Sequence, residues 1–161
     1  MRAQLLPLIG LASAILFAGL AVFSSVWLSA DGMDVFDGRV RGYDLVDARA
    51  YLSALSIEQT GLYQGLFRFL DTIFPALLAV TLCLSFRRAA RRGLRLAFLV
   101  MTALYLGADY TENAMVGRML ALGPDGINAR TVDTASLFTQ VKWGAFVICI
   151  CGLIWLRVRR A

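Results

Sequence analysis

The sequence contains no histidine, and this absence excludes several common site chemistries at once. Without histidine there is no His-ligated haem, no zinc site with an imidazole ligand and no His-based acid–base catalysis. Cysteine is also scarce, and Cys83, Cys149 and Cys151 all lie inside apolar runs. Because Cys149 and Cys151 are two residues apart, they would point to opposite sides of a helix. We therefore expect packing residues rather than a disulfide or metal framework, with no metal site and no cofactor.

Charge is the next shortage. Charged residues make up 17% of the 161 residues, against about 25% in ordinary soluble domains. Hydrophobic residues make up 59%, against about 45–50%, and the mean hydropathy is +0.69. A small soluble domain has too much surface to hide this excess in its core. The composition excludes a disordered chain, a collagen and a soluble disulfide scaffold, and predicts a single integral membrane domain over residues 1–161.

Four apolar runs are long enough to cross a hydrocarbon core of about 30 Å, which takes around 20 helical residues. They cover about residues 5–28, 62–86, 94–120 and 135–156. The first run exceeds the roughly 7–15 apolar residues of a signal peptide, so we expect a retained span. No run shows the period-two alternation of barrel strands. The predicted fold class is all-α, a four-helix transmembrane bundle.

The distribution of arginine predicts the orientation of the bundle. Five arginines lie between residues 87 and 95, three follow the fourth run, and Arg2 precedes the first. The loop from residue 29 to residue 65 instead holds three arginines against six acids. By the positive-inside rule, both termini are cytoplasmic and both longer loops are outside. We expect a multi-pass protein of the bacterial inner (plasma) membrane. The net charge of +5 then reflects topology, and no nucleic-acid partner is expected.

The first outer loop carries local signals of its own. Asp44 is a candidate N-cap with Asp47 three residues later, which favours the start of a helix. Four apolar positions then share one face: Ala48, Tyr51, Leu52 and Leu55. This pattern predicts a short extracytoplasmic amphipathic helix between spans one and two.

The rest of the outer side is less regular. Residues 36–43 mix aromatics with both charges, and could either cap the mouth of the bundle or form a solvated loop. The second outer loop carries a strong turn signal over residues 123–126. We expect Thr131, Asp133 or Thr134 to cap the fourth span.

Ionisable residues inside the runs are the most informative feature of the sequence. At 1.5 Å per residue, Asp71, Asp109, Glu112 and Lys142 all lie about 21–25 Å above the cytoplasmic arginines. A charge near the middle of a membrane costs about 2.5–3.5 kcal/mol. These side chains are therefore expected to face one another inside the bundle. Arg68 and Lys142, with Arg118 just above, would balance the three acids to a formal sum of zero.

Two interpretations of this layer stay open. It is either an ion network that fixes helix register or a polar pocket that opens toward the outer side. The predicted ligand-binding residues are Arg68, Asp71, Tyr105, Asp109, Glu112, Asn113 and Lys142. Carboxylates would bind the amine of a lipid headgroup, and basic groups its phosphate.

The functional hypothesis that we favour is not catalytic. It is binding of a lipid headgroup or small polar ligand, or service as an accessory subunit of a membrane complex. An alternative is an intramembrane hydrolase with an Asp71/Asp109 acid pair, in which Glu112 is a further catalytic candidate. An oligomeric transporter is a weaker alternative. The expected partners are membrane lipids, and a membrane-protein partner or a second copy of the chain.

A set of short motifs also resembles one known family. The motifs are Phe36-Asp37, Gly42-Tyr43, Tyr51-Leu52 with Leu55, Gly61 with Tyr63, Asp71 with Phe74-Pro75, and Asp109-x-x-Glu112-Asn113. They resemble a family of small bacterial four-span membrane proteins without an established activity. The resemblance covers roughly residues 36–145. It implies acids at the ends of spans two and three and adds no reaction.

Overall fold

The computed structural model describes the backbone of residues 2–159 and the side chains of residues 5–159. Within this range the regular elements are all helices and there is no strand, apart from one isolated bridge between Ala30 and Met33. The long elements are α1 (Arg2–Phe23), α4 (Arg68–Ala89), α5 (Arg92–Gly126) and α6 (Ala129–Val158). The short elements are η1 (Ser24–Leu28), η2 (Phe36–Gly38), α2 (Leu45–Ala54), α3 (Ile57–Leu62) and η3 (Tyr63–Phe67). The predicted all-α class is confirmed.

Three helical stretches are long and apolar enough to cross a membrane, and they cover Leu5–Leu28, Ile57–Ala89 and Ala129–Val158. The first joins α1 to the π-helical turn η1, and the second joins α3, η3 and α4. α5 is as long as these stretches but is more polar, because it carries Asp109, Glu112 and Asn113 in its second half.

Caps explain why the helices extend beyond the predicted runs. Ser56 accepts a hydrogen bond from the backbone N–H of Gln59, whose side chain accepts one from Ser56 in return. This capping box starts the second stretch at Ile57 rather than at residue 62. α6 begins at Ala129 because Asn128 caps it by accepting from the N–H of Thr131 at 3.1 Å. The predicted caps of this helix are therefore wrong.

α5 ends in the predicted turn. Gly123 has φ 68° and ψ 179° inside the helical stretch, so the helix kinks there before it ends at Gly126. A positive φ of this size favours glycine, which has no Cβ to clash with the backbone. The chain then reverses into α6.

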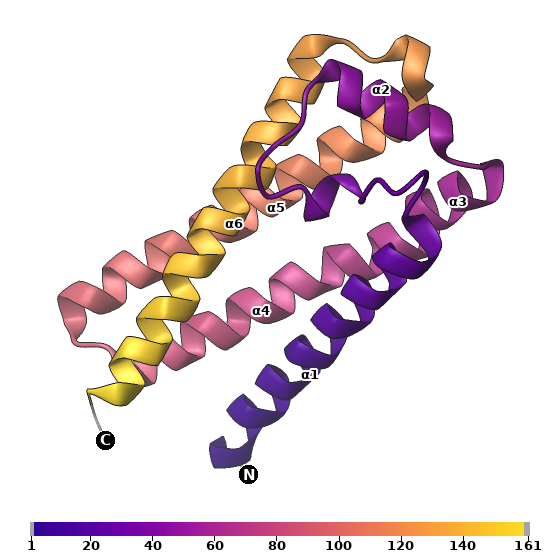
Figure 1. The fold of residues 1–161 in the computed structure, drawn as a ribbon. Helices are drawn as coiled ribbons and strands as arrows, with labels where there is room; N and C mark the ends of the chain where they lie inside the picture. Colours follow the sequence, from indigo (N-terminus) through magenta and orange to yellow (C-terminus); the bar gives the residue numbers. More distant parts are fainter. Residues whose placement is uncertain (1, 160–161) are drawn as a thin grey trace.

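A short helix, α2, is present where the sequence predicts one. Asp44 accepts from the backbone N–H groups of Val46 and Asp47, and Asp47 accepts from the N–H of Asp44. Ala48, Tyr51 and Leu52 form its buried face, as the spacing predicts. α2 lies across the end of the bundle that is opposite the two termini (Figure 1).

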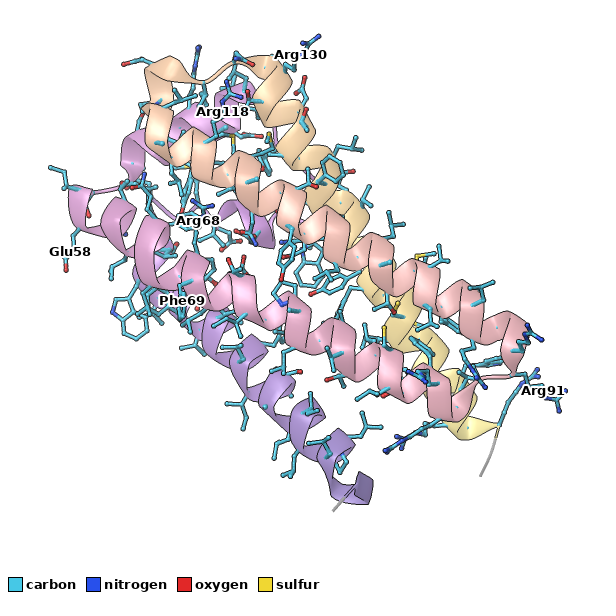
Figure 2. The ribbon with its side chains drawn as sticks, turned by 180° about the vertical axis from the view of Figure 1, so that it is seen from behind. Glu58, Arg68, Phe69, Arg91, Arg118 and Arg130 are labelled. Atoms are coloured by element: carbon cyan, nitrogen blue, oxygen red, sulfur yellow. The ribbon has the colours of Figure 1, made fainter. Side chains whose placement is uncertain are left out.

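Each long helix packs mainly against the long helix next to it along the chain. α5 packs most extensively against α6 and next against α4. α1 packs along α4, and its Phe17 also reaches Trp143 and Phe146 of α6. Both described ends of the chain lie at one end of the bundle (Figure 1). Arg91, between α4 and α5, lies at this end, whereas Glu58 and Arg130 lie toward the other (Figure 2).

Candidate functional site

The side chain of Lys142 on α6 lies at the centre of a buried cluster of carboxylates. Its ammonium nitrogen pairs with Asp37 Oδ1 at 3.0 Å, with Asp109 Oδ1 at 3.4 Å and with Glu112. Lys142 is 6% exposed and Glu112 is fully buried. Because Lys142 is the single lysine of the sequence, one ammonium group links η2, α5 and α6.

Asp109 and Glu112 present their carboxylates from one face of α5, since they lie three residues apart on a helix. The amide of Asn113 donates to Asp109 Oδ2 at 3.2 Å, and the hydroxyl of Thr139 donates to Glu112 Oε1. Burial of a charged group is costly unless it has partners. Asn113 and Thr139 supply part of this compensation, so they hold the two acids in place for Lys142.

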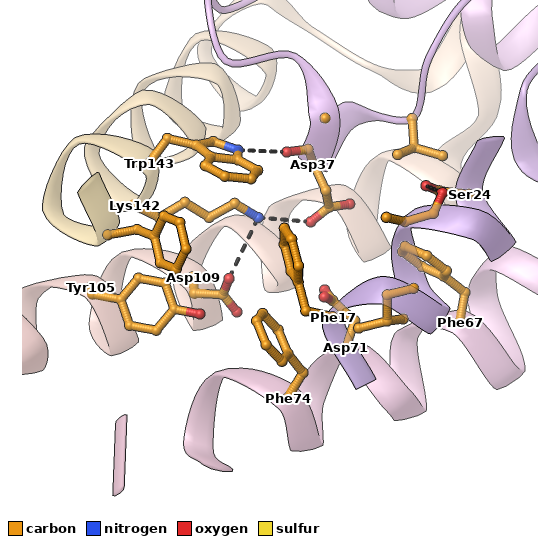
Figure 3. A pocket seen from close by; sticks show the side chains of 15 residues that line it. Phe17, Ser24, Asp37, Phe67, Asp71, Phe74, Tyr105, Asp109, Lys142 and Trp143 are labelled. Carbon is orange, nitrogen blue, oxygen red and sulfur yellow. Dashed lines mark hydrogen bonds and ion pairs between the residues drawn. The ribbon is translucent and has the colours of Figure 1, made fainter. Parts of the chain in front are cut away.

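Asp37 is a site residue that the sequence argument did not include. Its Oδ1 pairs with Lys142, and its Oδ2 accepts from the hydroxyl of Tyr63 at 2.9 Å. Its carbonyl accepts from the indole N–H of Trp143 at 2.8 Å (Figure 3). Asp37 is only 9% exposed although it lies between helices. The signal that could have found it is an acid directly after Phe36 in a loop rich in aromatics.

The segment from Phe36 to Tyr43 is docked on the bundle. Phe36 is fully buried, and the backbone N–H of Tyr43 donates to the hydroxyl of Ser136 at 2.9 Å. Gly42 has φ +86°, and a Cβ there would collide with Ser136 and Gln140. The backbone can approach α6 this closely because residue 42 is glycine. The segment therefore covers the mouth of the bundle and is not a solvated loop.

Aromatic contacts fasten this covering segment to α2 and η1. The hydroxyl of Tyr51 donates to the carbonyl of Leu28 at 2.8 Å, and its ring contacts that of Phe36 at 5.0 Å. The guanidinium of Arg39 lies 5.1 Å from the ring centre of Tyr51, a cation–π distance. Burial raises the pKa values of both Tyr51 and Tyr43 above their ordinary value.

Asp71 on α4 faces the same cluster but has fewer partners. It is 7% exposed, and its Oδ2 accepts no hydrogen bond from the described part of the chain. Arg68 lies one turn earlier and donates to the backbone carbonyl of Asn113 at 3.1 Å. Its guanidinium packs on Gly117. Arg68 therefore binds the backbone of α5, and within residues 5–159 it forms no ion pair with an acid.

A cavity of about 150 Å³ lies against the cluster. Its polar end is formed by Asp37, Asp71, Asp109 and Lys142 (Figure 3). Its other walls are mainly aromatic and aliphatic, and include Phe17, Leu20, Phe67, Phe74, Tyr105 and Phe146. Phe17 and Ala21 of α1 line the cavity and are also exposed, so the cavity is partly open on that side.

The structure brings most of the predicted residues together. Asp71, Tyr105, Asp109 and Lys142 line the cavity. Glu112 and Asn113 lie behind it, where they hold Lys142 and Asp109. Arg68 does not line it.

The predicted charge balance is wrong. Arg118 is exposed, Arg68 binds backbone, and Asp37 joins the acids. Three carboxyl groups therefore pair with the single ammonium group of Lys142, and that of Asp71 lines the same cavity. Among the described residues no group of three or more His, Cys, Asp or Glu is arranged to hold a metal ion.

Fold and site together define a helical protein with three helices apolar enough for a membrane and a charged cluster beside an apolar cavity. Comparisons of the chain with known protein families, with curated proteins and with solved structures found no match.

Proposed function

We propose that this chain is a four-span inner-membrane protein, with α5 as its third span. It would belong to the family of small bacterial four-span membrane proteins that its motifs resemble. Both termini and the arginine-rich link between α4 and α5 are cytoplasmic, and α2 lies on the extracytoplasmic surface. Three observations support this arrangement: the membrane-length apolar helices, the position of both described ends at one end of the bundle, and the arginines gathered at that end. The polar face of α5 is compatible with a membrane because it is turned toward Lys142.

The function of the protein is to bind an amphipathic ligand, of which a membrane lipid is the nearest example. The observation that carries this proposal is the cavity, which joins a charged end to aromatic and aliphatic walls. Binding sites for small molecules commonly combine a largely apolar lining with a few placed polar groups. The open side of the cavity beside α1 would let a ligand enter from the membrane.

The arrangement of the acids favours binding over hydrolysis. Asp109 is held by Lys142 and Asn113, and Glu112 by Lys142 and Thr139. A carboxylate paired with an ammonium group is a weaker general base, because the positive charge stabilises its deprotonated form. The Asp71/Asp109 hydrolase stays an alternative. It would show itself as turnover of the bound compound that is lost in Asp109→Asn.

Native mass spectrometry tests the proposal on protein extracted from membranes in a mild detergent. We expect a retained small mass on the wild type. Ala21→Trp places an indole in the cavity wall and should remove this mass. Ala14→Trp is the matched control, because Ala14 lies two turns earlier on α1, is exposed and does not line the cavity.

The results distinguish a ligand-binding role from a purely structural role of the charged cluster. Retention in Ala14→Trp with loss in Ala21→Trp supports a ligand in the cavity. Equal retention in both variants places the bound mass elsewhere and contradicts the proposal. A bare wild-type chain, or a stable assembly with another protein and no small mass, indicates an accessory or structural role.

A further inference from the structure

The cluster beside the cavity carries more negative than positive groups. Asp37, Asp71, Asp109 and Glu112 contribute four carboxyl groups, and Lys142 contributes the one ammonium group. All five residues are at least nine-tenths buried. An excess of buried charge is unfavourable until protons or a counter-ion offset it. A ligand with a positive charge would offset it, whereas an anionic group would increase the repulsion.

Asp71 is the carboxylate best placed to meet such a ligand. Asp37, Asp109 and Glu112 each pair with Lys142, but Asp71 does not. Its side chain points into the cavity from α4 (Figure 3). Its Oδ2 is buried without a hydrogen-bond donor among residues 5–159. One buried carboxyl oxygen without a donor therefore faces the space that a ligand would fill.

The walls of the cavity suit a cation with a hydrocarbon body. Phe17, Phe67, Phe74, Tyr105 and Trp143 all line it. The faces of aromatic rings attract ammonium groups, and such rings commonly enclose quaternary amines. The same rings are apolar surface for an alkyl chain. Aromatic walls and a free carboxylate thus favour the same chemistry.

We propose that the ligand carries an alkylammonium group, which binds Asp71 while its hydrocarbon part lies along the aromatic wall beside α1. The inference rests on the proposed binding function and names its ligand class. The ammonium group could belong to an amine-headed lipid or to a free amphipathic amine. Both share the same contact with Asp71.

The test compares three additives with the same alkyl chain and different head charges: dodecylammonium, dodecanol and dodecanoate. Each is added to the protein in detergent at the same low mole ratio to the detergent, and occupancy is read by native mass spectrometry. We expect dodecylammonium to bind and the other two to bind much more weakly. Asp71→Asn should lower the affinity for dodecylammonium by roughly 10- to 100-fold, the effect of losing one charge-assisted hydrogen bond.

Two variants and one measurement serve as controls. Glu58→Gln removes one acid at the exposed outer end of the bundle and should leave dodecylammonium binding unchanged. Asp71→Glu keeps the charge and should retain most of the affinity. Thermal unfolding of ligand-free Asp71→Asn should match or exceed the wild type, since the variant loses a buried charge without an ion-pair partner. A purely structural carboxylate would instead make this variant less stable.

The outcomes separate this inference from the proposed function. If all three additives bind equally and Ala21→Trp blocks them, the cavity binds amphiphiles but the amine is wrong. If Asp71→Asn binds dodecylammonium as the wild type does, the inference is also wrong. If none of the three binds, both proposals fail.

A final arm identifies the source of the amine. Phosphatidylethanolamine nanodiscs should displace dodecylammonium if the natural ligand is an amine-headed lipid. If only the free amine binds, these nanodiscs should behave like phosphatidylglycerol nanodiscs.

Discussion

At the residue scale, the site depends on a single ammonium group with three acidic partners. Lys142 contacts Asp37, Asp109 and Glu112, which come from η2 and α5. A buried ion pair adds little net stability compared with well-packed apolar residues, but removal of one partner leaves the other charge uncompensated. Removal of the Lys142 charge should therefore lower stability much more than removal of any single acid. When one acid is removed, Lys142 still has two partners.

Lys142→Met tests this asymmetry. The substitution keeps most of the length of the side chain and removes its charge, so it should lower the free energy of unfolding by about 3–5 kcal/mol. Thermal unfolding in detergent measures the effect. Arg130→Met is the control, because Arg130 is an exposed basic residue on the same helix and should change stability by less than about 0.5 kcal/mol. Equal stability of the two variants would contradict the central role of Lys142.

The sequence predicts part of this site well. Helical spacing places Asp109, Glu112 and Asn113 on one face of α5, and the cost of a charge in a membrane argues that they face Lys142. Asp37 could not be found this way, since it lies 72 residues before Asp109 in an irregular segment with no period. Arg68 was assigned to the acids on charge alone. In the structure its guanidinium instead reaches a backbone carbonyl of α5, a partner that no charge pattern predicts.

At the element scale, the chain between α1 and α3, which includes the Phe36–Tyr43 segment and α2, acts as a cover that is held by hydrogen bonds to residues distant in the sequence. Gln59 donates to the carbonyls of Trp27 and Ser29, and Arg49 donates to the carbonyl of Pro124. Tyr51 donates to Leu28. The cover thus connects η1, α2, α3 and the end of α5. The Asp44 cap and the apolar face of α2 are readable in the sequence, but where α2 docks is not, because that depends on partners distant in the chain.

Tyr51 makes the docking of this cover sensitive to alkaline pH. Burial raises the pKa of Tyr51, and also that of Tyr43, above the ordinary value of 10.0. A raised pKa contributes stability that is fully present below pH 10.0 and is lost as the pH rises toward the higher pKa of the docked state. We expect near-UV circular dichroism to stay constant from about pH 8 to about pH 10 and to fall above it.

Tyr51→Phe is the matched variant for this titration. It should show a shallower loss above pH 10, because the contribution of Tyr51 is removed while that of Tyr43 remains. At neutral pH it should be less stable by about 1 kcal/mol, since the carbonyl of Leu28 loses its donor. An alkaline transition that is identical in the two proteins would show that Tyr51 does not control docking.

At the scale of the whole molecule, the two ends of the bundle differ in character. The end with both described termini and the α4–α5 link is rich in arginine, and the other carries α2 and the covering segment. The number of helices that cross the membrane decides on which side the α5–α6 turn lies. If α5 crosses the membrane, the α5–α6 turn lies on the same side as α2. The hydropathy of α5 alone does not secure this crossing, so its acids must be compensated by Lys142.

Cysteine labelling in intact cells tests this topology. In a chain with Cys83, Cys149 and Cys151 replaced by alanine, single cysteines are placed at three exposed positions: Ile57, Asp125 and Gly93. A membrane-impermeant maleimide should label Ile57→Cys and Asp125→Cys directly, and Gly93→Cys only after permeabilisation. If only Gly93→Cys were labelled in intact cells, the orientation would be the reverse of the proposed one. If Asp125→Cys were protected together with Gly93→Cys while Ile57→Cys was labelled, α5 would not span the membrane. In that case its acids would not be membrane-embedded, and they would not carry the cost of a charge in hydrocarbon.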